Sequence, residues 1–299
     1  MKLLITGAWQ QAKEHIPELR ALGHEVSFLQ QERDPLPCDP ETIEGVVCNG
    51  LFLYHPIEQF TRLRFIQLTS AGFDRVPMDY VKDHNIEIRN AAGVYSIPMA
   101  EFALAGVLSL YKKLDTFLAQ QRNHAWTKQR NLRELNGKCV LIIGCGNVGS
   151  ECAKRFSAFG CKVIGLNRTV KPKAFFDEVY PLAELDDLLP GADIVVVTIA
   201  LTKETRGLMT AGRICLMKPD AILVNISRGA VVPTCALEES IDSIGGAVLD
   251  VFEEEPLSPD SPLWDKENVL VSPHNSFVGE GNAERLSSLV IRNIKNLSV

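Results

Sequence analysis

The sequence predicts an α/β protein that combines a doubly wound parallel sheet with a second, smaller α/β domain. From about residue 138 onward, short β-branched segments alternate with helical ones. These segments are hydrophobic almost throughout, as strands covered on both faces are. The first 95 residues show a looser alternation of the same kind. A length of 299 residues also suits two domains better than one.

The larger domain is predicted to contain six strands. Their expected ranges are Cys139–Ile143, Lys162–Leu166, Asp193–Ile199, Ala221–Asn225, Ala247–Val251 and Val269–Ser272. Helical stretches lie between them, and one of these places Cys152 and Phe156 on an apolar face and ends at Gly160. Strands that alternate with helices in this way indicate a doubly wound parallel sheet.

The smaller domain is predicted to have strands near residues 2–6, 25–29, 46–48, 65–68 and 86–89, with a helix at Ala12–Leu22. A long apolar helix from Met99 to about Leu118 follows, and Pro98 suits its first turn. The polar stretch Asn123–Asn136 is predicted to be a loop. Tyr95 either faces a binding site or packs beneath the long helix, and the sequence leaves both open.

Composition and charge exclude several classes of function. The net charge is −6, and no block rich in lysine and arginine indicates a nucleic-acid surface. The sequence contains no run of 18 or more apolar residues, which is the length that a membrane-spanning helix needs. The amino-terminal apolar segment is too short for a signal peptide. The eight cysteines form no C-x-x-C pair, so we expect buried thiols in a reducing, cytoplasmic setting and no metal site.

A glycine-rich motif follows the first strand of the larger domain. Residues 144–149 read G-C-G-N-V-G, so the predicted cofactor-binding residues are Gly144, Gly146, Asn147, Val148 and Gly149. Alone, such a match is weak, because glycines also mark ordinary turns. Here the motif connects a strand to an amphipathic helix, where glycines permit a tight turn, a close approach to a pyrophosphate and close helix–strand packing. The motif therefore predicts a Rossmann-type dinucleotide site, with the pyrophosphate at the helix amino terminus.

The end of the second strand indicates which dinucleotide is bound. NAD-specific sites place an acidic residue there, whereas this chain has Asn167, Arg168 and Thr169. A neutral side chain removes the repulsion of a 2′-phosphate, while the guanidinium and the hydroxyl can donate to it. A solvated basic loop is the alternative. We expect NADP(H) to be preferred, with NAD(H) possible.

Polar residues also follow three later strands. They lie in the segments Asn225–Gly229, Asp250–Pro256 and Ser272–Asn275. Ligands of open α/β sheets bind at the carboxyl edge, so these segments are expected to meet at one site. Each alone is ordinary, but together they supply the arginine, carboxylate and histidine that reduction of a carbonyl requires.

From about Thr69 onward the chain resembles the D-isomer-specific 2-hydroxyacid dehydrogenase family. The resemblance is carried by Ser70–Asp74, the glycine motif, Asn225–Gly229, Leu249–Pro256 and Ser272–His274. Residues 1–60 match only in fold pattern. The resemblance implies a flavodoxin-like substrate domain at 1–97 with 277–299, and a dinucleotide-binding domain at 98–276.

The resemblance also implies roles for individual residues. His274 would be the general acid that protonates the substrate carbonyl, and Glu255 would pair with it and keep it protonated. Arg228 would bind the substrate carboxylate and polarise the 2-oxo group. The expected substrates are small 2-oxo and 2-hydroxy acids of the glyoxylate or hydroxypyruvate kind.

The remaining implied contacts come from backbone groups and from the cofactor side of the site. Backbone N–H groups at Ala71 and Gly72 would hold the substrate carboxylate, and Ile226, Ser227 and Asp250 would line the cofactor site. A homodimer formed through the long helix and its loop is also implied. The alternative to an enzyme is a non-catalytic, dinucleotide-sensing module on the same fold that binds proteins. Formate oxidation on the same fold is a third hypothesis. It requires a different partner for the histidine, and Glu255 at that place argues against it.

Overall fold

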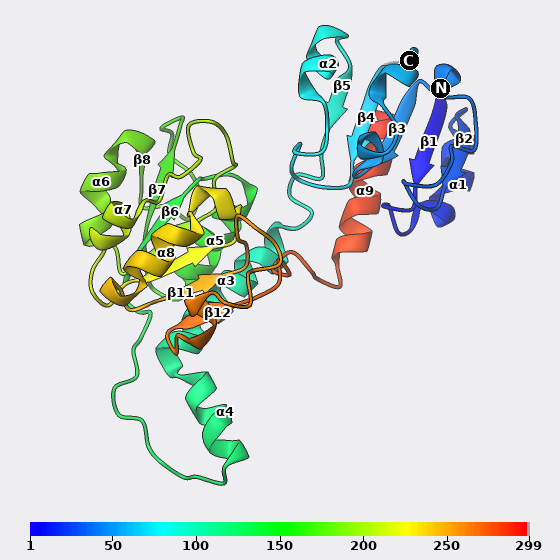
Figure 1. The fold of residues 1–299 in the computed structure, drawn as a ribbon. Helices are drawn as coiled ribbons and strands as arrows, with labels where there is room; N and C mark the ends of the chain where they lie inside the picture. Colours follow the sequence, from blue (N-terminus) through cyan, green and yellow to red (C-terminus); the bar gives the residue numbers. More distant parts are fainter. Residues whose placement is uncertain (298–299) are drawn as a thin grey trace. The chain divides into compact units, whose positions relative to one another are not determined.

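The computed structural model describes residues 1–297 and divides into two compact units, each with its own parallel sheet (Figure 1). Unit 1 comprises Met1–Tyr95 and the segment from Gly279 onward, and unit 2 comprises Ser96–Val278. The predicted fold class is confirmed.

Unit 2 contains a seven-stranded parallel sheet with the order β12-β11-β10-β9-β6-β7-β8. The strands are β6 (Cys139–Ile143), β7 (Lys162–Asn167), β8 (Glu178–Pro181), β9 (Ile194–Val197), β10 (Ile222–Asn225), β11 (Gly246–Leu249) and β12 (Val269–Val271). Strand β8, an edge strand of four residues, was not predicted from the sequence. The strand order reverses between β6 and β9, and open α/β sheets bind ligands at the carboxyl ends of the strands at such a point.

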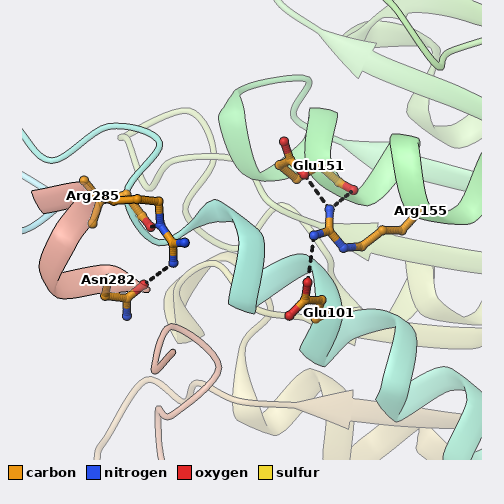
Figure 2. A network of polar contacts seen from close by, with 6 residues as sticks. Glu101, Glu151, Arg155, Asn282 and Arg285 are labelled. Carbon is orange, nitrogen blue, oxygen red and sulfur yellow. Dashed lines mark hydrogen bonds and ion pairs between the residues drawn. The ribbon is translucent and has the colours of Figure 1, made fainter. Parts of the chain in front are cut away.

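Helices cover both faces of this sheet. They are α3 (Ser96–Lys112), α5 (Asn147–Ala158), α6 (Leu185–Leu188), α7 (Ala211–Cys215) and α8 (Thr234–Ser240), whereas α4 (Leu114–Arg122) belongs to unit 2 but buries no side chain. In Figure 2, Arg155 of α5 joins the two helices that cover one face, since it bonds Glu151 of its own helix and lies 2.9 Å from Glu101 of α3. Glu101 therefore connects α3 to α5.

The predicted long helix is two helices. Lys113 adopts a left-handed conformation with φ of 51°, which ends α3 and starts α4 in a new direction. A non-glycine residue rarely takes this conformation, so a purely apolar pattern could not reveal the break. None of the side chains of α4 is buried, and Figure 1 shows this helix and the following loop extending away from the sheet of unit 2. The predicted loop at Asn123–Asn136 is confirmed.

Unit 1 contains a five-stranded parallel sheet with the order β2-β1-β3-β4-β5, the order of flavodoxin-like folds. Its strands are β1 (Lys2–Thr6), β2 (Glu25–Leu29), β3 (Gly45–Cys48), β4 (Phe65–Leu68) and β5 (Glu87–Arg89), and its helices are α1 (Ala12–Ala21), α2 (Met78–Asp83) and α9 (Asn282–Lys295). Tyr95 belongs to this unit, where its hydroxyl donates to Thr69 O and its ring packs against the core.

Helix α9 returns the end of the described chain to unit 1. Leu286, Val290 and Ile294 form an apolar stripe at helical spacing and are buried in the same cluster as Leu3 and Ile5 of β1. At the start of α9, the Arg285 guanidinium donates to Val94 O at 2.8 Å and to Asn282 Oδ1 at 2.8 Å (Figure 2).

The cysteines follow the prediction in part. Cys48, Cys145, Cys152 and Cys161 are buried, and burial raises the pKa of the Cys145 and Cys161 thiols to about 11. The expectation of buried thiols is wrong for Cys215 and Cys235, which are exposed at the surface on α7 and α8. Among residues 1–297, no helix is both long and apolar enough to cross a bilayer.

Candidate active site

The glycine motif forms the turn between β6 and α5, and each glycine has a separate steric reason. Gly144 has φ of +103°, and a Cβ there would lie 2.7 Å from the backbone nitrogen of Ile199. A Cβ on Gly149 would lie 2.0 Å from Gly144 O, so α5 could not pack this closely on the turn. The Thr198 hydroxyl fixes the turn by donating to Gly144 O at 2.7 Å. Thr198 was not predicted as a site residue, because its place just after β9 is the one feature of the sequence that indicates such a role.

The turn has the space and the donors that a pyrophosphate requires. A Cβ on Gly146 would meet no atom within 4 Å, so the backbone is open on that side. Gly146 is also the residue that precedes α5, whose first N–H groups have no partner within the helix. Open space beside unpaired helix N–H groups suits a bound phosphate, and the motif therefore fits a dinucleotide.

Asn167, Arg168 and Thr169 lie at the carboxyl end of β7, beside this turn. The Asn167 amide donates to Thr169 O at 3.1 Å, so it shapes the start of the loop. The side chains of Arg168 and Thr169 are exposed. Since Gly144 N donates to Leu166 O at 2.8 Å, the end of β7 is a neighbour of the turn that the glycine motif forms at residues 144–149 (the phosphate turn).

Arg228 lies in a short loop after β10 that Asn225 holds in place. The Asn225 amide oxygen accepts from Ser227 N at 3.2 Å and from Ser227 Oγ at 2.9 Å. Gly229 then touches the loop after β11, because a Cβ there would lie 1.8 Å from the carbonyl carbon of Phe252. Arg228 itself is half-buried, and its guanidinium donates to Ser227 O at 2.8 Å.

Asp250 connects the strand-end loops. It follows β11 and is 1% exposed, and its carboxylate accepts from Ser272 Oγ at 2.6 Å, Asn275 N at 2.7 Å and Ser276 N at 3.0 Å. Its backbone carbonyl accepts from His274 N at 2.8 Å. Asp250 therefore holds the loop that carries the histidine.

His274 and Glu255 form the expected pair. His274 Nδ1 lies 2.8 Å from Glu255 Oε2, and Glu255 Oε1 accepts from Phe252 N at 3.2 Å. A carboxylate at Nδ1 assigns the proton of that nitrogen to the hydrogen bond and leaves Nε2 for a ligand. The side chains of His274 and Glu255 are 40% and 39% exposed. The ring edge of Phe277 faces the imidazole, with centroids 6.0 Å apart.

The remaining predicted site residues have the following surroundings. Ile226 is 1% exposed in the apolar cluster beneath α3 and α5, and Ser227 is 7% exposed. Ala71 and Gly72 belong to unit 1, in the segment after β4. Among the residues that the structure describes, the N–H groups of Ala71 and Gly72 donate no hydrogen bond. Asn90 Nδ2 fixes the segment by donating to Ala71 O at 2.6 Å.

Comparison with known proteins gives the same assignment along most of the chain. Residues 104–276 match the family model described as "D-isomer specific 2-hydroxyacid dehydrogenase, NAD binding domain". A glyoxylate reductase of Thermococcus gammatolerans is 33% identical over 291 residues, covering 93% of this chain and 84% of the relative.

Two solved structures match almost the whole chain. A D-isomer specific 2-hydroxyacid dehydrogenase of Xanthobacter autotrophicus, in complex with NADPH and MES, is 28% identical with a TM-score of 0.79, covering 98% of this chain and 94% of that one. A D-lactate dehydrogenase of Aquifex aeolicus, complexed with NAD and lactic acid, is 26% identical with a TM-score of 0.80, and the coverage is again 98% and 94%. Similar structures therefore hold either nicotinamide dinucleotide.

Proposed function

Since the chain belongs to the D-isomer-specific 2-hydroxyacid dehydrogenase family, and so is an NAD(P)-dependent oxidoreductase acting on 2-hydroxy acids, we propose that it is an NADP-dependent reductase of small 2-oxo acids such as glyoxylate or hydroxypyruvate. The observation that carries this proposal is the contact of 2.8 Å between His274 Nδ1 and Glu255 Oε2, at the carboxyl edge of the sheet that bears the glycine motif.

In the proposed mechanism the histidine handles the proton. The nicotinamide, when bound, supplies the hydride that reduces the 2-oxo carbon. His274 donates the Nε2 proton to the carbonyl oxygen, and it removes that proton in the reverse direction. Glu255 is fixed by Phe252 N and holds Nδ1, so the ring keeps one orientation and the imidazolium keeps a counter-charge beside it.

Arg228 is the proposed ligand of the substrate carboxylate. A guanidinium presents paired N–H donors that can serve a carboxylate and a neighbouring carbonyl oxygen together. In the other unit, the N–H groups of Ala71 and Gly72 lack protein acceptors within the described residues, and we propose that they bind a carboxylate as well. The predicted division into a substrate domain and a dinucleotide domain is part of this proposal.

The preference for NADP rests on the end of β7. Arg168 and Thr169 are exposed beside the phosphate turn, and Asn167 brings no negative charge there. An acidic side chain at that place would accept from the ribose hydroxyls and repel a 2′-phosphate. Initial rates with NADPH and NADH test this preference, and a higher kcat/KM with NADH contradicts it.

The test of the activity compares two histidine variants. With NADPH and a panel of 2-oxo acids, His274→Gln is expected to lower kcat by about 10²- to 10⁴-fold, the usual contribution of a general acid, while NADPH still binds. His84→Gln, which removes a hydrogen bond from an exposed ring to Tyr80 O and the stacking of that ring on Tyr80, is the control and keeps the wild-type rate. A wild-type chain that binds NADPH yet reduces no acid would instead be the non-catalytic module.

We also propose that the chain forms a homodimer through α4 and the loop that follows it. Leu118 of α4 is 53% exposed and Trp126 of the loop is 97% exposed. Apolar side chains that project from a unit in this way are typical of a covered surface. Light scattering of the wild type and of Leu118→Glu measures the mass, and a monomeric wild type contradicts the proposal.

We place this activity in the cytoplasm. The eight cysteines are free, which suits a compartment that keeps thiols reduced. Fractionation of cells that express the chain checks the location, and recovery outside the cytoplasmic fraction contradicts it.

A further inference from the structure

The loop after β7 is fastened to the sheet at both ends. At its start, Asn167 Nδ2 donates to Thr169 O at 3.1 Å. At its end, Asp177 N donates to Val163 O at 2.9 Å, and the Asp177 carboxylate accepts from Val163 N at 2.7 Å. The intervening residues therefore have a defined position above the end of the strand.

A glycine in β7 lets this loop approach the phosphate turn. A Cβ on Gly165 would lie 2.5 Å from Cys145 Sγ and 2.8 Å from Cδ1 of the Phe176 ring. Phe176 can cover the strand only because position 165 has no side chain. Cys145 is the second residue of the glycine motif, so the loop and the turn pack against one another.

Lys173 connects the loop to the turn. Its ammonium group donates to Cys145 O, and its side chain is half-buried. Within residues 1–297 this Nζ forms no other hydrogen bond or ion pair, so two of its three N–H donors remain for a ligand. A positive charge is thus held at a turn that already fits phosphate.

We propose that Lys173 is a cofactor-binding residue that, together with Arg168, binds the 2′-phosphate of NADP. This inference rests on the NADP preference proposed above. The pyrophosphate belongs at Gly146 and the start of α5, whereas Cys145 lies one residue earlier, next to the end of β7 where the adenosine ribose is read. Lys173 is therefore on the ribose side of the turn. A point-like ammonium complements the planar guanidinium of Arg168 around one phosphate.

The test measures binding and needs no turnover. Titrations with NADPH, NADH, 2′-AMP and 5′-AMP compare the wild type with Lys173→Met. We expect the dissociation constants for NADPH and 2′-AMP to rise about 10- to 100-fold, as for loss of a hydrogen bond between charged groups. Those for NADH and 5′-AMP should stay within about threefold. Added salt should weaken NADPH binding more in the wild type than in the variant.

Two further variants separate charge from architecture. Lys171→Met removes an exposed lysine two residues away in the same loop and should change NADPH affinity by no more than about threefold. Lys173→Arg keeps the charge and should retain most of the affinity. Thermal unfolding and circular dichroism show whether each variant is folded.

The outcomes are distinct. Equal losses for NADPH and NADH would place Lys173 at the pyrophosphate and overturn the proposal. A lower Tm with unchanged affinity for all four ligands would make Lys173 a structural tether and also overturn it. If the wild type reduces no 2-oxo acid but Lys173→Met still loses 2′-AMP, the proposed function fails while the role of Lys173 stands.

Discussion

Replacing Asp250 by Asn separates two roles for this residue. The family pattern assigns Asp250 to the cofactor side of the site, whereas in the structure both carboxylate oxygens accept hydrogen bonds from the His274 loop. Asn has almost the same shape but only one acceptor oxygen. If Asp250 acts by holding the loop, Asp250→Asn lowers kcat and leaves the affinity for NADPH within about twofold of the wild type.

The magnitude follows from the three contacts. Oδ1 accepts from Ser272 Oγ and Asn275 N, and Oδ2 accepts from Ser276 N. An amide oxygen at the Oδ1 position keeps two bonds in weaker, uncharged form, while the new NH₂ group faces the N–H of Ser276. Leaving a buried donor unsatisfied costs about 1–3 kcal/mol, and the two weakened bonds add about 1 kcal/mol. We expect a loss of about 2–4 kcal/mol in the free energy of unfolding, with kcat reduced about 10- to 100-fold.

The matched control is another carboxylate, which lies at the amino ends of the strands of the same sheet. Asp193 precedes β9, and its carboxylate accepts from Cys139 N at 2.8 Å and from Lys218 Nζ at 2.9 Å. Asp193→Asn should cost stability in the same way but leave kcat unchanged. The assays are urea unfolding, steady-state kinetics with NADPH and a 2-oxo acid, and NADPH titration for each protein.

Three results would refute the positioning role. Wild-type kcat in Asp250→Asn, measured where the variant is fully folded, would show that the His274 loop does not depend on the carboxylate. A large loss of NADPH affinity with little change in kcat would return Asp250 to the cofactor. An equal loss of kcat in Asp193→Asn would attribute the effect to general destabilisation.

Three further predictions concern the same unit. Gly229→Ala should abolish soluble folding or lower Tm sharply, because a Cβ there would lie 1.8 Å from a backbone carbon. Gly212→Ala lies in α7 and its Cβ would have no neighbour nearer than 3.9 Å, so this variant should keep or raise Tm. A similar fall in Tm for both variants would refute this. Thr198→Val removes the hydroxyl that holds the glycine turn, so the dissociation constant for NADPH should rise about 5- to 15-fold, as for one lost hydrogen bond. An unchanged constant would show that the turn keeps its shape without it. Although burial raises the pKa of Asp193, its hydrogen bond from Cys139 N and the Lys218 ammonium bring the pKa below its ordinary value. This carboxylate therefore stabilises the fold at neutral pH and loses that contribution below about pH 4. In acid unfolding, the difference in stability between wild type and Asp193→Asn should shrink below that pH. A difference that stays constant would contradict the lowered pKa.

The parts of the fold that depend on local patterns were predictable from the sequence. Runs such as Cys139–Ile143 are buried on both faces, which makes them continuously apolar and easy to recognise. The glycine motif was equally readable, because Gly144 and Gly149 answer steric demands that no other residue meets. The contact between Glu255 and His274 was expected only from the family pattern, since 19 positions separate the two residues.

The parts that depend on tertiary contacts were not predictable. The break at Lys113 requires a left-handed lysine directly after an apolar helix, and no local rule favours it. The edge strand β8 forms because Glu178–Pro181 pairs with β7, although its own composition is unremarkable. The Lys173 contact depends on a missing side chain at Gly165, whose consequence appears only when β7, the loop and the turn are packed together.

Buried amide and carboxylate side chains at strand ends explain why the site lies where it does. Asn225 is the last residue of β10, Asp250 follows β11 directly, and each accepts from backbone N–H groups ahead of it or in the next loop. Such side chains end a strand by offering its loop an alternative partner. Asp250 N also donates to Asn225 O at 3.0 Å, so the Arg228 and His274 loops share one support. Substitutions at Asn225 and Asp250 should therefore be non-additive, and additive losses in a double-mutant cycle would show that the two loops are held independently.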